Sequence, residues 1–139
     1  MITIKRTGEA ELQRMLAKMG KAFTPSQAED DLLVAVRPMV EAAVGNVSLG
    51  PPSIHLRENI GASPDADGAR SQGWLACVKV GAFWVGKIGE IFYGRFLEFG
   101  TVKQAARPWL RPAFDQHRGE TVSRLGSLVN GRVIAAVGK

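Results

Sequence analysis

Residues 93–114 contain the features that most limit how this chain can fold. Aromatic and aliphatic side chains fill the first part of the segment, and Gly100 interrupts them before Pro108 and Pro112 follow. Glycine allows a positive φ or a close approach of two backbones, whereas proline suits the first turn of a helix. The segment therefore predicts a turn at Gly100 and a helix that starts near Pro108. Such a segment is typical of an assembly element rather than of a catalytic site.

One acidic residue, Glu98, lies inside this apolar segment between Phe96 and Phe99. A carboxylate that becomes buried needs a cationic or hydrogen-bonding partner. We expect this partner to be the guanidinium group of Arg107 or Arg111. The other interpretation is a simple turn that ends a strand and closes the core, and the two are compatible.

The composition is that of a single soluble domain, which we expect to span residues 1–139. Of the 139 residues, 45% are hydrophobic and 22% are charged. A chain of this size and composition can form one hydrophobic core without disulfide bridges or a structural metal. The single cysteine, Cys77, excludes an internal disulfide and fits a reducing cytoplasm. The chain has neither a run of about 18 apolar residues nor the apolar core of a signal peptide. We therefore expect no transmembrane helix and no secretion.

The positive charge is concentrated in the last third of the chain. The net charge is +5, and residues 1–94 contribute none of it, because ten Lys or Arg residues balance ten Asp or Glu residues. Residues 95–139 hold eight Lys or Arg residues against three acidic ones. A basic face could meet nucleic acid or an acidic protein, but this charge is small for binding through counterion release. A solvated helix rich in arginine is the simpler interpretation, and a small nucleic-acid-binding protein is the alternative.

The N-terminal part of the chain predicts two helices. Apolar residues recur at helical spacing over residues 9–22. Thr24 and Gln27 then have the spacing of a capping box, with Pro25 at the first helical position. Pro38 should kink this second helix because it lacks a backbone N–H. The apolar face of the second helix holds Leu32, Val36, Met39, Val40 and Ala43.

The middle of the chain predicts turns and a mobile loop. Residues 50–53, Gly-Pro-Pro-Ser, should break the second helix. A short turn of helix that holds Leu56 and Ile60 should follow. Residues 61–73 are rich in Gly, Ala, Ser, Pro and Asp, which predicts an exposed and mobile loop.

Residues 74–80 are rich in β-forming residues and predict a strand, with residues 82–85 as its hairpin partner. Residues 91–97 fit either a strand or a short helix. A helix is favoured by the helical spacing of three aromatic residues, Phe92, Phe96 and Phe99.

The last predicted helix covers residues 109–136. Its apolar side holds Phe114, Thr121, Leu125, Leu128, Val129 and Ala136. Gly119 and Gly126 are seven residues apart, on nearly one face, and would permit the close approach of another backbone. Arg118 and Arg132 fall near the apolar side, so each must extend to solvent or meet a partner. This arrangement favours an interface.

Patterns that would indicate catalysis or a cofactor are weak. Residues 81–88 approach the P-loop pattern, but Ile88 has no hydroxyl for magnesium. The two histidines, His55 and His117, have no Cys, Asp or Glu at ligand spacing. Cys77 is best interpreted as a small core residue. We therefore expect no enzyme activity, no cofactor and no metal.

The acidic clusters have simple structural interpretations. Residues 29–31, Glu-Asp-Asp, lie in the first part of the second helix, where carboxylates interact favourably with the helix dipole. Asp65 and Asp67 fit solvated residues of the predicted loop. Nothing in their spacing indicates a catalytic pair.

Residues 93–114 also resemble the signature of a family of tailed-phage proteins. That signature is roughly Tyr, an aliphatic residue, Glu-Phe-Gly-Thr, and then Ala-x-Pro-Phe-Leu-x-Pro-Ala. The family comprises lambdoid tail-component proteins, also called head–tail joining, tail-completion or neck proteins. The residues of this chain that carry the resemblance are Tyr93, Phe96, Glu98, Phe99, Gly100, Thr101, Arg107, Pro108, Trp109, Arg111 and Pro112. Trp109 stands where the family usually has phenylalanine.

The upstream order of helix, breaker and short turn extends the resemblance to roughly residues 30–125. It implies an α+β fold, in which a small antiparallel sheet packs against N-terminal helices and a long C-terminal helix. The implied role is structural, in the virion and in the host bacterial cytoplasm during assembly. Members are expected to form a homo-oligomeric ring at the head-proximal end of the tail. The implied partners are other copies of the chain, the tail-tube protein and connector or neck proteins. DNA could also be contacted, without specificity, and no membrane partner is expected.

Overall fold

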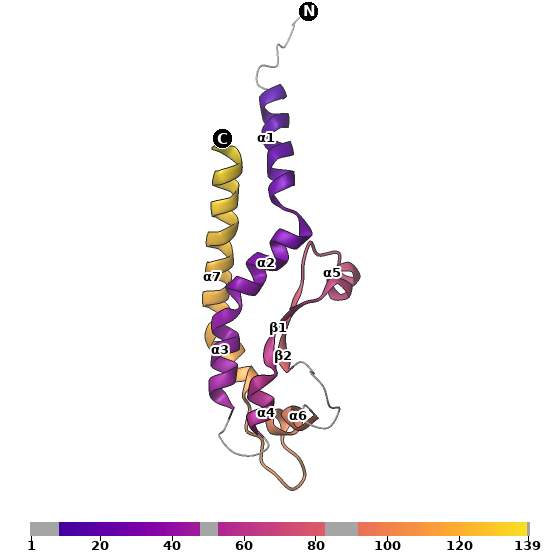
Figure 1. Ribbon diagram of the computed structural model, residues 1–139, viewed down its shortest axis with the longest axis vertical. Coiled ribbons are helices and arrows are strands. Elements are labelled where there is room, and N and C mark those ends of the chain that lie inside the picture. Colours follow the sequence, from indigo (N-terminus) through magenta and orange to yellow (C-terminus); the bar gives the residue numbers. More distant parts are fainter. Residues whose placement is uncertain (1–8, 48–52, 83–91, 139) are drawn as a thin grey trace, which may run out of the picture.

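The protein is an elongated α+β molecule in which long helices accompany one small sheet (Figure 1). The computed structural model describes residues 9–47, 53–82 and 92–138. The elements in chain order are α1 (Glu9–Ala22), α2 (Pro25–Ala35), α3 (Arg37–Asn46), α4 (Ser53–Glu58), β1 (Ile60–Pro64), α5 (Ala66–Gln72), β2 (Val78–Ala82), α6 (Phe92–Phe99) and α7 (Leu110–Val137). The expected α+β class is confirmed, with a two-stranded antiparallel sheet and a long C-terminal helix.

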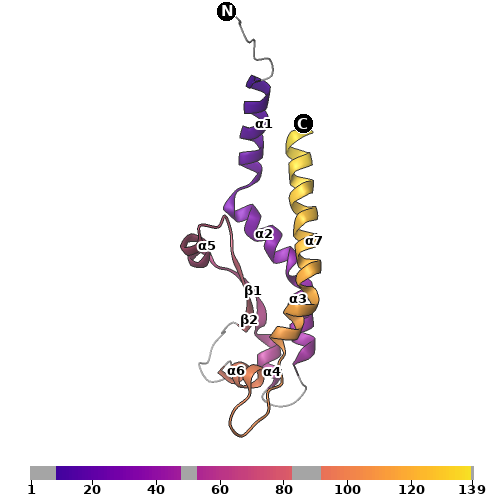
Figure 2. The ribbon, with the colours of Figure 1, turned by 180° about the vertical axis from the view of Figure 1, so that it is seen from behind.

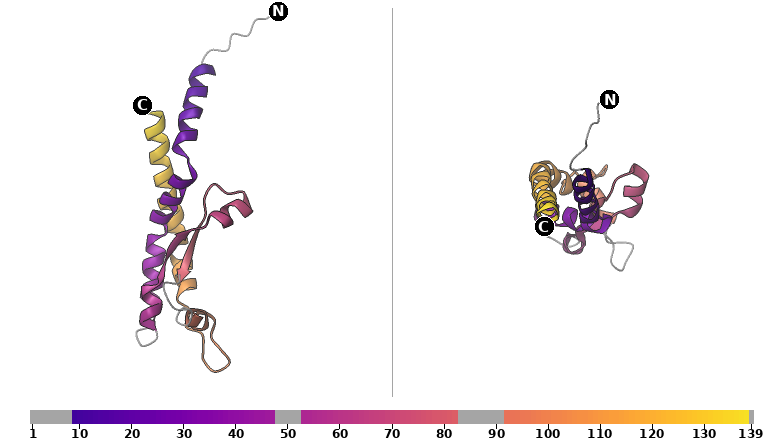
Figure 3. Two further views of the ribbon diagram at one scale, coloured as in Figure 1. Left: turned by 45° about the vertical axis from the view of Figure 1, so that its right-hand side comes forward. Right: turned by 90° about the horizontal axis from the view of Figure 1, so that it is seen from above.

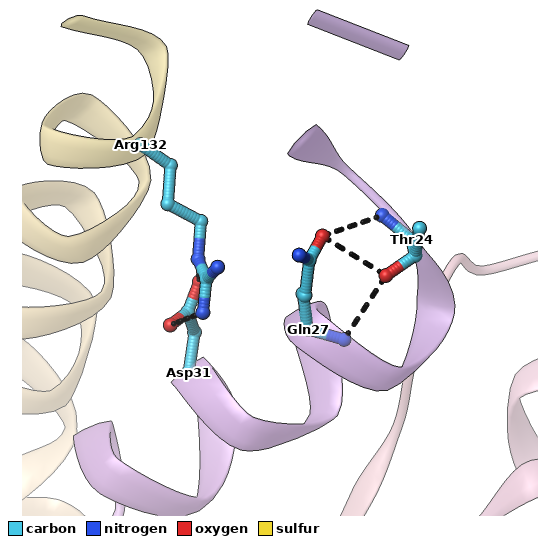
Figure 4. A network of polar contacts seen from close by, with 4 residues as sticks. All are labelled: Thr24, Gln27, Asp31 and Arg132. Atoms are coloured by element: carbon cyan, nitrogen blue, oxygen red, sulfur yellow. Dashed lines mark hydrogen bonds and ion pairs between the residues drawn. The ribbon is translucent and has the colours of Figure 1, made fainter. Parts of the chain in front are cut away.

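The first helices form where the local sequence predicts them. α1 covers the predicted range, and the expected capping box starts α2. The Gln27 N–H donates to Thr24 Oγ1 at 3.4 Å, and the Thr24 N–H donates to Gln27 Oε1 at 3.3 Å (Figure 4). Each end of the box thus satisfies a backbone N–H that the helix itself leaves unpaired.

The expected second helix is in fact two helices. α2 ends before Val36, and α3 starts after it with Pro38 in its first turn. Proline has no N–H to donate and disfavours a helical conformation in the preceding residue, so the predicted kink becomes a break. The chain changes direction here, as Figure 1 shows.

The sheet differs from the predicted one. Residues 61–73 form most of β1 and all of α5 instead of a mobile loop, and Ile60 begins β1 rather than belonging to the short helix. The strand expected at residues 74–80 begins only at Val78 and includes Ala82, and its partner is β1. Four predicted features lie wholly or mostly outside the described residues. They are the rest of the expected hairpin partner, the turn that follows it, the P-loop-like segment and the breaker.

Helix α5 lies in the connection between the two strands and projects from the side of the molecule (Figure 2). Asp65 caps it, because its Oδ1 accepts a hydrogen bond from the Gly68 N–H at 3.1 Å. The other oxygen of the same carboxylate lies 2.9 Å from the ammonium group of Lys79 in β2. Asp65 is therefore a structural residue and not the solvated loop residue that we expected.

The buried core occupies one end of the molecule. It is formed where α3, α4 and β1 meet the start of α7, and its residues are Met39, Ala43, Val47, Leu56, Ile60, Trp109 and Ala113. α6 adds the partly buried Leu97 to this cluster. The residues that carry the predicted family resemblance lie at this end.

The far half of α7 extends beyond the core and runs beside α1 (Figure 3). The helix has nearly the predicted bounds. A Cβ atom placed at Gly119 or Gly126 would meet no described atom within 4 Å other than the neighbouring backbone of α7 itself. No other described element of this chain therefore uses the two glycines for close packing, and their contact with another chain stays a prediction.

Candidate assembly surface

Glu98 holds the start of α7 in place. Its Oε2 accepts hydrogen bonds from the N–H groups of Trp109 at 2.7 Å and Leu110 at 2.9 Å, and its Oε1 accepts from the Arg111 N–H at 3.0 Å. These are the backbone groups that a helix leaves unpaired at its first turn, where the helix dipole also favours a negative charge. The prediction that an arginine side chain would pair with Glu98 is wrong, because the backbone amides take its carboxylate oxygens.

Gly100 makes the turn that brings Glu98 to α7. Its φ is +74°, which confirms the predicted positive φ. An added Cβ would lie 2.8 Å from the Ala106 nitrogen and 2.9 Å from the Gln104 oxygen, so the close backbone approach is also present. The turn is closed by the Arg107 N–H, which donates to the Leu97 carbonyl at 2.7 Å.

Trp109 anchors the same region in the core. It is only 4% exposed, and its Nε1–H donates to the Gly94 carbonyl at 3.0 Å. The Asn46 side chain donates to the Trp109 carbonyl at 3.1 Å, which ties the end of α3 to the start of α7. A Cβ at Gly94 would lie 2.8 Å from the Leu56 side chain, so the absence of a side chain there allows α6 to approach α4.

The remaining predicted residues divide into two groups. Phe96 and Pro112 are half-buried, whereas Phe99, Thr101, Arg107, Pro108 and Arg111 are exposed. Tyr93 lies in α6, and its side chain is outside the described part of the structure. The signature thus combines residues that fix the fold with residues that face outward.

An open apolar groove lies beside this turn, between β2 and α7, and has a volume of about 610 Å³. We call it the α7 groove. It is lined by Val36, Met39, Val78, Val80, Glu98, Phe99, Leu110, Arg111, Phe114, Arg118, Thr121 and Val122. Sequence reasoning missed the groove because the lining comes from four separate elements. The sequence placed Val36, Met39, Phe114 and Thr121 on apolar helix faces, but it did not show that these faces meet β2.

Polar groups are few in the α7 groove. The carboxylate of Glu98 is occupied by the start of α7, which leaves the cationic side chains of Arg111 and Arg118 on the α7 side. Thr121 Oγ1 is buried and has no hydrogen-bond partner in the described part of the chain. The groove therefore presents an apolar surface with positive charge along one edge.

An ion pair ties the far half of α7 to α2. The two guanidinium nitrogens Nε and Nη2 of Arg132 donate to the two carboxylate oxygens of Asp31 at 2.5 and 2.8 Å (Figure 4). The hydrogen bond to Asp31 raises the pKa of Arg132 above its ordinary value. Arg132 thus has the partner that its position near the apolar side required. Our helix-dipole interpretation of residues 29–31 is wrong, because α2 begins at Pro25 and has no acidic residue in its first turn.

A second polar cluster is exposed on α7. His117 Nδ1 lies 3.0 Å from a Glu120 oxygen, so the expectation that no acid lies at a suitable spacing from a histidine is wrong for His117. Arg124 donates to the other Glu120 oxygen at 2.9 Å. Hydrogen bonds from His117 and Arg124 lower the pKa of Glu120.

Cys77 is half-buried and precedes β2 rather than lying inside the strand.

No protein-family model, curated protein or solved structure matches the chain. Within residues 9–47, 53–82 and 92–138, no group of three or more His, Cys, Asp or Glu residues could hold a metal ion. None of the helices in these ranges is both long enough and apolar enough to cross a bilayer.

Proposed function

We propose that this chain is a structural assembly protein of a tailed phage or prophage. It completes the tail, or joins it to the head, by forming a homo-oligomeric ring at the head-proximal end of the tail. Its partners are other copies of itself, the tail-tube protein and the connector or neck proteins, and it acts in the host cytoplasm and in the virion. The family resemblance of residues 93–114 suggests this function.

The observation that carries the proposal is the exposure of large apolar side chains on α1 and α7. Val122 is 70% exposed, Ile134 is 62% exposed, and Leu12 and Leu16 in α1 are 58% and 57% exposed. Single exposed apolar residues are ordinary, but side chains gathered along two neighbouring helices are typical of surfaces that bind a protein. Such surfaces are expected of a subunit that is complete only in an assembly.

The signature residues have a consistent part in this proposal. Glu98, Gly100 and Trp109 set the direction in which α7 leaves the core, through the contacts described above. α7 carries much of the exposed apolar surface, so an error at its start would displace that surface. These residues thus position the proposed assembly surface.

Nucleic-acid binding by the basic C-terminal region remains the alternative function. It receives less support because Arg124 and Arg132, two of the α7 arginines, already pair with Glu120 and Asp31. A tight complex with DNA that weakens steeply as salt increases would support the alternative.

The proposed function is tested by locating the protein in particles. A tagged copy is expressed in place of the wild-type gene, particles are purified, and antibody-coated gold is viewed by electron microscopy. We expect gold at the head-proximal end of the tail. A protein that is absent from purified particles, or distributed along the whole tail, would contradict the proposal.

A further inference from the structure

We propose that the α7 groove binds an amphipathic helix of a different protein, whose apolar face is flanked by acidic residues. The inference rests on the proposed function, because it gives the chemistry by which a tail or connector protein would be held. It commits to an acidic helix because the shape, the lining and the charge of the groove fit this occupant.

The shape of the groove suits a helix. Its α7 side runs from Leu110 to Val122, which is about 18 Å or three turns of helix. Val78 and Val80 line the β2 side; they are two residues apart, so they lie on one face of the strand. An open groove of this length, between a helix and a strand face, has the form in which proteins bind a partner helix.

The lining of the groove leaves large apolar side chains open to solvent. Phe99, Phe114 and Val122 line it, and each is more than half exposed. Apolar side chains gathered at one place on a surface are typical of a site that a protein covers. A partner helix with apolar residues at i, i+4 and i+7 would place its anchors against them.

The charge of the groove selects an acidic partner. Arg111 and Arg118 are seven residues apart, so they lie on one side of α7, about two turns from each other. Both are exposed, and neither side chain forms an ion pair with another described residue. The carboxylate that lines the groove, Glu98, is bound by three backbone N–H groups. Two acidic residues seven apart on a partner helix could therefore each meet one guanidinium group.

The same charge disfavours a second copy of this chain as the occupant. The chain has a net charge of +5. Its helix with exposed leucines, α1, carries Arg14, Lys18 and Lys21 against two glutamates. Binding of this helix would bring further cations to the groove arginines, and like charges placed side by side act against a contact. The charge therefore points to a different and acidic protein.

The test is the binding of two synthetic peptides to the purified full chain, measured by fluorescence anisotropy. Each peptide carries fluorescein and has about 18 residues, because shorter helices are marginal in water. The first has leucines at helical spacing, flanked by glutamates of which two are seven residues apart. The control peptide has lysine in place of every glutamate. We expect the acidic peptide to bind with a Kd at least about tenfold lower than the control peptide.

Substitutions in the chain locate the site. Arg111→Gln combined with Arg118→Gln should raise the Kd of the acidic peptide roughly threefold to tenfold, the effect of losing two exposed ion pairs. Phe114→Ala should raise it about tenfold, as the loss of an aromatic anchor does. The matched control, Arg95→Gln combined with Arg107→Gln, removes the same charge outside the groove and should change the Kd less than about twofold. All five side chains are exposed, so each variant should keep the wild-type thermal unfolding midpoint.

Equal affinity for the two peptides, or an equal loss in the groove variant and its matched control, would overturn the proposal. Sedimentation velocity tests the other occupant, because a chain that self-associates and thereby excludes the peptide would have a second copy in the groove, which would also overturn it. Binding of the acidic peptide by a protein that is absent from particles would support the site and refute the phage function. Gold at the tail end without peptide binding would do the reverse.

Discussion

Replacing Glu98 with alanine should destabilise the protein through the start of α7. The carboxylate accepts three backbone N–H groups, of which those of Trp109 and Leu110 are partly buried and that of Arg111 is exposed. A hydrogen bond to a charged group contributes about 1.5–3 kcal/mol, and water can replace the exposed one. Because the two partly buried bonds share one oxygen, we expect a loss of about 2–4 kcal/mol rather than the sum of all three.

The assay is urea unfolding followed by circular dichroism, with thermal unfolding in parallel. Glu98→Ala should lower the urea midpoint at an unchanged slope and the melting temperature by roughly 6–16 °C. Glu98→Gln keeps one carbonyl oxygen without the charge and should show about half of the loss. Asp115→Ala, an exposed acid further along α7, is the control and should stay within about 0.5 kcal/mol of wild type. A Glu98→Ala protein as stable as this control would refute the reasoning.

Four further substitutions test other parts of the structure. Gly100→Ala should destabilise the protein by at least about 1–2 kcal/mol, because Gly100 has a positive φ. Gly126→Ala, in open space on α7, should stabilise the protein by about 0.5–1 kcal/mol. Urea titrations that show equal effects would contradict both assignments. Thr121→Val should raise stability by about 1 kcal/mol by removing a buried, unpaired hydroxyl, and a clear loss in the same titration would reveal a hydrogen bond that it makes. The folded pKa of Asp65 lies below its ordinary value of 3.8, mainly through its hydrogen bond to Lys79. The stabilisation by Asp65 is therefore present above about pH 4 and is lost as the pH falls through the folded pKa. The melting temperature of Asp65→Asn should depend less on pH in that range than the melting temperature of the wild type.

Features with a local sequence signal were predictable. The capping box of Thr24 and Gln27 acts within one turn of helix, and the aromatic spacing around Phe96 describes one short helix, so no distant residue was needed. Gly100 was predicted for the same reason, because a positive φ is a property of one residue. The bounds of α1 and α7 followed from long periodic patterns.

Features that depend on distant partners were not predictable. Residues 61–63, Gly-Ala-Ser, have little preference for a strand and form one because β2 pairs with them. The sequence showed that Glu98 needs a partner, and it favoured an arginine. Only the position of α7 shows that the backbone N–H groups at the start of this helix bind the carboxylate. Arg132 was recognised as needing a partner, yet its partner Asp31 is 101 residues away.

The proposed role in completing or joining the tail is tested most directly by electron microscopy of particles from a phage or prophage that lacks this gene. We predict tails of abnormal length, or filled heads beside unattached tails, and recovery of normal particles when the wild-type chain is supplied. Supplying Glu98→Ala should restore fewer joined particles than supplying Asp115→Ala at equal protein level. Normal, joined and infectious particles in the absence of the gene would contradict the central claim that this chain completes or joins the tail.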